Sequence, residues 1–161
     1  MQSVLMRLSI CLCFFLFMSG CGFGAKQTPE GGTIMVIGQI EDLRAYSRVD
    51  FKGFKSDIGR NLPEPVLRSI NDAVADRLRK TEFNQSSGKT LVVKGDIIHF
   101  ETTPNRYAVA RVALIDPERA ETVGLANVTG RATAEAVTVP DEVAAGIANG
   151  VDDLLRQRMV P

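Results

Sequence analysis

The sequence predicts an α+β domain, a two-layer sandwich in which two helices cover one face of a mixed or antiparallel sheet of about four to five strands. Residues 65–81 and a segment from Pro140 carry apolar residues at steps of three and four, as amphipathic helices do. Residues 90–100, 107–115 and 121–139 are rich in strand-forming residues and are separated by turns. Each helix has a single apolar stripe, so both stripes need one sheet face to cover.

Residues 33–40 are the first strand candidate. Ile34, Met35, Val36 and Ile37 form a short apolar run, which is typical of a strand buried on both faces. Gly38 within this segment indicates a bulge or a close approach of another backbone.

Residues 41–63 have no regular pattern. Three aromatic residues, Tyr46, Phe51 and Phe54, stand among charges and glycines. We expect a long connection whose aromatic side chains pack on the core. Connections of this length are often functional or mobile.

Residues 65–81 are predicted to form the first helix. Pro63 and Pro65 suit its N-terminal boundary. Basic residues in its last turns favour the negative end of the helix dipole. The predicted core stripe consists of Val66, Leu67, Ile70, Val74 and Leu78. Residues 84–88 then form a turn.

The strands that follow are joined by short turns, so we expect an antiparallel meander. Residues 121–139 give one long strand or two, and Gly124 and Gly130 within them indicate bulges. Pro140 opens the second helix, and acidic residues in its first turn have the favourable sign of charge. Its predicted stripe consists of Val143, Ile147, Val151, Leu154 and Leu155.

The beginning of the chain has the layout of a secretory signal peptide. Arg7 precedes an apolar run over residues 8–18, and the small residues Ser19 and Gly20 lead into Cys21. The run is about half of the ~20 residues that a membrane-spanning helix needs. The end of this segment resembles the lipobox of bacterial lipoproteins, with Met18 where leucine is usual. An uncleaved N-terminal anchor or a buried core helix is the alternative.

The lipobox resemblance implies that the chain is cut before Cys21 and that the Cys21 thiol is acylated. It divides the sequence into a signal peptide at 1–20, a lipidated tether at 21–32 and a single domain at 33–161. Cys11 and Cys13 would leave with the signal, so the mature chain has no thiol for a disulfide. Gly22 stands where an aspartate would retain a Gram-negative lipoprotein in the inner membrane. We therefore expect an outer-membrane lipoprotein that faces the periplasm.

The charge balance argues against two classes of partner. The chain has 19 basic and 19 acidic residues, a formal net charge of zero. A nucleic-acid surface would need a basic excess, and an anionic lipid surface a polybasic patch. The expected membrane contact is therefore the lipid anchor on Cys21, since two or three acyl chains hold a protein durably.

No motif predicts a catalytic, cofactor-binding or metal-binding residue. Residues 87–90 read Ser-Gly-Lys-Thr like the end of a phosphate-binding loop, but Phe83 replaces its first glycine and the segment leads into a strand. His99 is the only histidine, and on a strand it is expected to be a residue of the sheet face. One histidine without a mature thiol also argues against a zinc site. The adjacent acids at 41–42 and 152–153 point apart and are expected on solvated faces.

Two segments carry a family resemblance. Residues 91–100 have an apolar strand, then Gly95 and Asp96, then a second apolar strand; residues 111–116 and 128–131 form a companion. After an amphipathic helix, these segments resemble an uncharacterised family of bacterial envelope lipoproteins. The resemblance spans residues 33–157 and implies a compact α+β domain akin to curli-secretion and TolB amino-terminal domains. It carries no catalytic residues to transfer.

These observations predict a non-enzymatic, lipid-anchored periplasmic domain that binds or assembles with other envelope proteins. The alternative is a small-ligand-binding or enzymatic periplasmic domain that uses the 41–63 loop over a sheet edge. No cofactor is expected in either case.

Overall fold

The structure, a computed structural model, describes residues 32–81, 88–103, 105–133 and 138–159. The predicted signal peptide, Cys21 and nearly all of the tether lie outside these ranges, and so does most of the predicted 84–88 turn. Those interpretations remain predictions.

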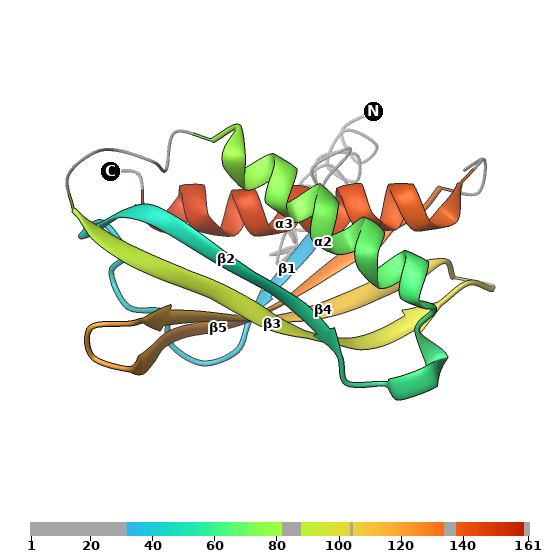
Figure 1. Cartoon of the computed structure of the whole chain (residues 1–161), viewed down its shortest axis with the longest axis horizontal. Coiled ribbons are helices and arrows are strands. Elements are labelled where there is room, and N and C mark those ends of the chain that lie inside the picture. Colours follow the sequence, from blue (N-terminus) through green and yellow to red (C-terminus); the bar gives the residue numbers. More distant parts are fainter. Residues whose placement is uncertain (1–31, 82–87, 104, 134–137, 160–161) are drawn as a thin grey trace, which may run out of the picture.

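A five-stranded mixed sheet with two α-helices on one face forms the domain (Figure 1), and it confirms the predicted α+β class. The strand order is β1-β5-β4-β3-β2. The elements are β1 (Thr33–Val36), β2 (Tyr46–Ser56), the 3-10 turn η1 (Gly59–Asn61), α2 (Glu64–Arg79), β3 (Lys89–Glu101), β4 (Tyr107–Asp116), β5 (Glu121–Arg131) and α3 (Val139–Met159).

The predicted antiparallel meander is β3, β4 and β5, paired in that order. β1 adds to the outer side of β5, also antiparallel. β2 pairs parallel to β3, and α2 makes the crossover between them, as a parallel pair requires. Within the described part of the chain, no helix has the length and apolar character to cross a membrane.

The expectation that residues 41–63 form a long connection is wrong, because residues 46–56 are the edge strand β2. The register of β2 against β3 shifts between Phe51 and Phe54, where Gly53 has a φ of 84°. The amide of Asn71 on α2 bonds both backbone groups of Phe54, at 2.7 and 3.1 Å. This bulge breaks the two-residue alternation that a strand otherwise shows. The aromatic residues do pack on the core, with Tyr46 and Phe54 buried.

The first strand is shorter and more exposed than predicted. β1 ends at Val36, and it lies at the sheet edge instead of being buried on both faces. Met35 is 58% exposed, Val36 38% and Ile37 36%. An apolar run is buried on both faces only where other elements cover both faces, and β1 lies at an edge of a sheet whose helices all lie on one face.

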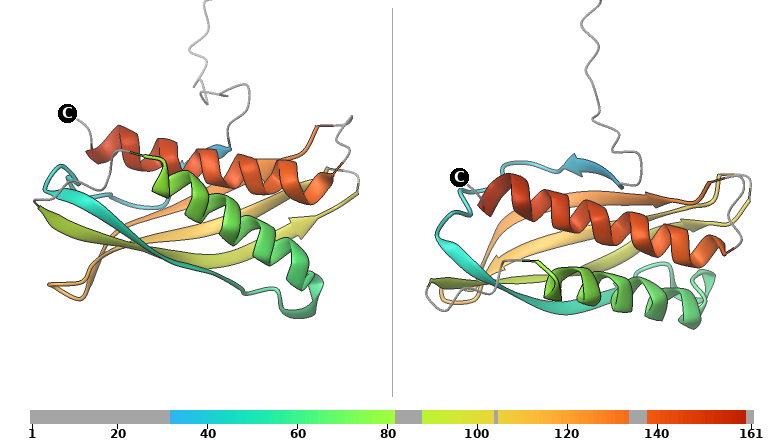
Figure 2. Two further views of the ribbon diagram at one scale, coloured as in Figure 1. Left: turned by 45° about the horizontal axis from the view of Figure 1, so that its top comes forward. Right: turned by 90° about the horizontal axis from the view of Figure 1, so that it is seen from above.

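The core lies between the sheet and the helices. The α2 stripe buries Val66, Ile70, Val74 and Leu78 as predicted, whereas Leu67 is only partly buried. α3 is buried along most of its length, including the whole predicted stripe. The two helices lie side by side and run in the same direction across the sheet (Figure 2).

The two strand glycines that indicated bulges differ. Gly124 lies beside a register shift between β4 and β5, as a bulge would place it. Gly130 is in regular register opposite Ala108, so its predicted bulge is wrong. A Cβ on Gly130 would lie 2.2 Å from the Val143 carbonyl oxygen, so glycine here permits the close approach of α3 to β5.

Candidate functional site

The end of β4 carries a buried carboxylate. Asp116 is 1% exposed and accepts hydrogen bonds from the Tyr46 hydroxyl at 2.7 Å and the Arg119 Nε at 3.0 Å. The backbone amides of Glu118 and Arg119 donate at 2.8 and 3.1 Å. Hydrogen bonds hold the pKa of Asp116 well below its usual range; the bond from the Tyr46 hydroxyl has the largest effect, and those from Arg119 and Glu118 add to it. Asp116 is therefore ionised wherever the protein is folded at neutral pH.

Arg119 links Asp116 to further acidic side chains in an ion-pair network. Its guanidinium contacts Glu41 at 2.6 Å and Glu121 at 3.2 Å. The hydrogen bonds to Glu41 and then to Asp116 raise its pKa. Burial is the largest cause of the raised pKa of Tyr46, so the hydroxyl keeps its proton and donates to Asp116. The network ties the β1–β2 connection and β2 to the β4–β5 turn. Each strong donor here faces an acceptor, which suits fixing a turn better than reacting with a substrate.

The prediction that residues 152–153 lie on a solvated face is wrong for Asp152. This side chain is fully buried, between Arg77 on α2 at 2.9 Å and Arg156 on α3 at 3.1 Å. Asp153 is only partly buried, because adjacent helix positions point in different directions. Asp152 is therefore an ion-pair residue of the helix contact.

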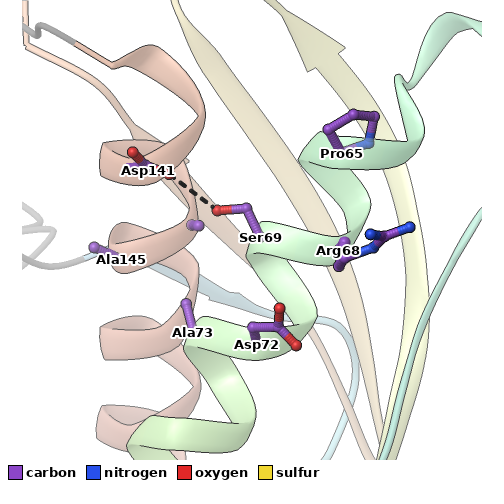
Figure 3. Close-up of a pocket in the computed structure, with 8 residues that line it drawn as sticks. Pro65, Arg68, Ser69, Asp72, Ala73, Asp141 and Ala145 are labelled. Carbon is purple, nitrogen blue, oxygen red and sulfur yellow. Dashed lines mark hydrogen bonds between the residues drawn. The ribbon is translucent and has the colours of Figure 1, made fainter.

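An open groove of about 490 Å³ lies between the N-terminal halves of α2 and α3 (Figure 3). Small side chains such as Ala73 and Ala145 make up much of its wall. The Ser69 hydroxyl points across the groove and donates to Asp141 at 3.2 Å. The groove joins the two helices through this bond, and its polar lining side chains are Arg68, Ser69, Asp72 and Asp141.

The residues singled out from the sequence do not converge on a reaction centre. His99 lies on the sheet face, as predicted, with its side chain 47% exposed and its ring stacked on Tyr107 at 4.8 Å. Gly88 and Lys89 lead into β3, not into a helix that could bind phosphate. Within the described ranges, no three His, Cys, Asp or Glu side chains form a group that could hold a metal ion.

The sheet face that points away from the helices is the candidate binding surface. Along the strands its residues alternate with buried ones such as Val112 and Val128. Figure 1 shows both helices on the opposite side of the sheet. One row crosses all five strands in register: Met35, Asn127, Arg111, Asp96 and Lys55.

The uncovered face ends at the β1 edge, where the exposed large apolar side chains of the described chain gather: Met35, Val36 and Ile37. Beside Met35, the Oδ1 of Asn127 is buried without a hydrogen-bond partner among the described residues. A buried acceptor without a donor is costly. The edge therefore has exposed apolar area to offer a partner, next to a buried acceptor that the described residues leave without a donor. Sequence reasoning missed this surface because it expected β1 in the interior.

Comparison with known proteins gives a fold but no family. No family model and no curated protein sequence matches the chain. A PelC dodecamer from Paraburkholderia phytofirmans has a TM-score of 0.56 and 14% identity, over 81% of this chain and 99% of that one. A point variant of the same dodecamer gives a TM-score of 0.50 at 14% identity, over 74% and 98%.

A third structure, described as that of a candidate lipoprotein from Caulobacter crescentus CB15, has a TM-score of 0.45 and 10% identity, over 71% of this chain and 92% of that one. That score is too low to support an argument. The two higher-scoring structures establish a shared fold: the chain has the α+β architecture seen in the PelC subunit.

Proposed function

We propose that the protein is a lipid-anchored protein of the bacterial envelope whose domain is a non-enzymatic module that assembles with other copies of itself. The observation that carries this proposal is the apolar β1 edge. Met35, Val36 and Ile37 lie exposed a few residues after the predicted tether. Exposed apolar groups at a sheet edge mark sites of association.

Two further points support the proposal. The sequence up to Cys21 resembles a lipoprotein signal, with outer-membrane placement facing the periplasm as the expected location. The PelC structure that shares this fold is a dodecamer. Other envelope proteins are a second class of partner for the same surface.

The alternative function, ligand binding or catalysis under a 41–63 loop, has little structural support. A ligand site under a 41–63 loop would need a loop, whereas residues 46–56 are hydrogen-bonded into the sheet as β2. The helix groove is open, and its Ser69 and Asp141 bond each other. The assembly function therefore has the stronger structural basis.

The test uses the full chain extracted from its own membranes in mild detergent. Light scattering after size-exclusion chromatography is expected to give the mass of more than one copy over a tenfold dilution. A monomer mass throughout would overturn the assembly proposal. In parallel, Cys21→Ser is expected to abolish fatty-acid labelling and to release the chain from the membrane. Unchanged labelling would overturn the anchor.

A further inference from the structure

The two edges of the sheet differ in how they are protected against pairing. The β2 edge carries exposed Arg48, Lys52 and Lys55, and its ladder is interrupted at Gly53. Lysines and bulges are the usual devices that keep an edge strand from pairing with another chain. The β1 edge has neither, since it pairs with β5 in unbroken register and no charge occurs from Thr33 to Ile40.

Hydrogen-bonding groups of β1 point outward at alternate residues. The Ile37 amide bonds the Leu125 carbonyl at 2.8 Å, on the β5 side. Because the direction of these groups alternates along an antiparallel strand, those of Ile34 and Val36 point away from the sheet. Two outward residues separated by one residue are the pattern that a second strand can pair with.

We propose that this edge binds the β1 edge of a second copy, antiparallel about a two-fold axis, so that two sheets become one. The proposal rests on the self-assembly proposed above. In the pairing that uses both outward residues, the backbone of Ile34 forms hydrogen bonds with Val36 of the other copy. The backbone of Val36 does the same with Ile34 of that copy. Met35 then faces its own counterpart at a non-hydrogen-bonded position, where Cα atoms lie about 4.5 Å apart. The most exposed apolar side chain of the edge is thereby covered.

Charge favours a second copy of this chain as the occupant. A two-fold contact sets an edge against an identical edge, so an edge with a net charge would repel its copy and an uncharged one does not. By this criterion β1 can pair with β1, whereas the exposed basic residues Arg48, Lys52 and Lys55 oppose the pairing of β2 with β2.

The position of the tether favours the same occupant. The chain enters β1 at Thr33, and in an antiparallel pair of four-residue strands the two entry points lie roughly 14 Å apart. Each tether reaches at most about 35 Å, so both anchors meet the same bilayer. Three side chains bury far less than the roughly 800 Å² per partner of a standard interface. Two copies confined to one membrane gain the effective concentration that so small a contact needs.

Disulfide trapping in intact membranes tests the pairing, because the predicted mature chain has no free thiol. Met35→Cys in the full chain is expected to give a disulfide-linked dimer under mild oxidation, since facing Cα atoms 4.4–6.8 Å apart can be bridged. The matched control Lys52→Cys, on the protected β2 edge, is expected to stay monomeric on a non-reducing gel. Val36→Cys faces Ile34 in this register and is expected to trap far less.

Each outcome is decisive. No Met35→Cys dimer in a protein that light scattering shows to be assembled would overturn this pairing and leave the proposed function standing. A monomer in both assays would overturn both. As a second variant, Met35→Lys is expected to abolish the assembly without lowering the melting temperature, because this side chain is exposed in the single copy. Assembly retained in Met35→Lys would also contradict the pairing.

Discussion

Asp152 on α3 and Arg77 on α2 form an ion pair of 2.9 Å in which the aspartate side chain is fully buried and the arginine side chain is 46% exposed. Arg156, one turn further along α3, bonds the other carboxylate oxygen at 3.1 Å. The two arginines satisfy a charge that the helix contact could not otherwise hold. The pair thus fixes how α2 and α3 lie along one another.

Removing both arginines is expected to be severe. Arg77→Met with Arg156→Met leaves the buried carboxylate unpaired and should cost about 3–5 kcal/mol of unfolding free energy in denaturant titration. Adding Asp152→Leu should recover most of this loss, because an apolar side chain of similar size needs no partner. A triple variant as unstable as the double one would show that the ion pair is not the cause.

The buried helix stripes should respond to truncation. Ile70→Ala and Leu154→Ala remove side chains that are 0% and 2% exposed, and each should cost about 2–5 kcal/mol. Leu67→Ala is the matched control, because Leu67 is only partly buried and should cost less. Equal losses at Leu67 and Ile70 in denaturant titration would contradict the assigned helix face.

Gly130→Ala should destabilise the contact between β5 and α3. The new methyl would lie 2.2 Å from the Val143 carbonyl oxygen and 2.8 Å from the Ile147 amide nitrogen, so the helix must move. Gly38→Ala is the control, since its methyl would meet nothing within 4 Å and only the positive φ of 82° opposes it. The melting temperature should fall further for Gly130→Ala; the reverse order would refute this account.

Protonation of Asp116 should lower the stability of the folded protein in acid. Its pKa is lower in the folded protein than the ordinary value of about 4, so its contribution is complete above that pH and is lost as the pH falls toward the folded value. Thermal unfolding should therefore show the melting temperature falling below about pH 4. In Asp116→Asn the melting temperature should be lower at pH 7, and its fall in acid smaller. An identical acid profile in both proteins would exclude this carboxylate as the cause.

His99→Ala is expected to leave stability and any null-strain phenotype unchanged. The side chain is about half exposed, stacks on Tyr107 and lies 3.8 Å from the Glu101 carboxylate. A histidine that acts as a general base contributes about 10²–10⁴-fold, which could not be lost unnoticed. A lost phenotype at an unchanged melting temperature would instead place a ligand or a reaction at His99.

The sequence predicts helices and strands best where a single apolar periodicity runs through the whole element. α2, α3 and the meander repeat their apolar residues regularly, and they lie where predicted. β2 was hidden by the bulge at Gly53, which interrupts its alternation. β1 was placed in the interior because an apolar run cannot reveal which strands lie beside it. Asp152 and Asp116 are buried by partners distant in sequence, such as Arg77 and Tyr46, and no local pattern encodes those pairings.

The pairing of β1 with β5 has a consequence for how the protein is made. Thr33 pairs with Thr129, so the strand of the domain that is synthesised first cannot pair until β5, the last strand, has been synthesised. At about 5–20 residues per second, synthesis of the intervening chain takes on the order of 5–20 s. During that time Ile34, Met35 and Val36 have no β5 to pair with. The first strand therefore joins the sheet only after most of the domain has been synthesised.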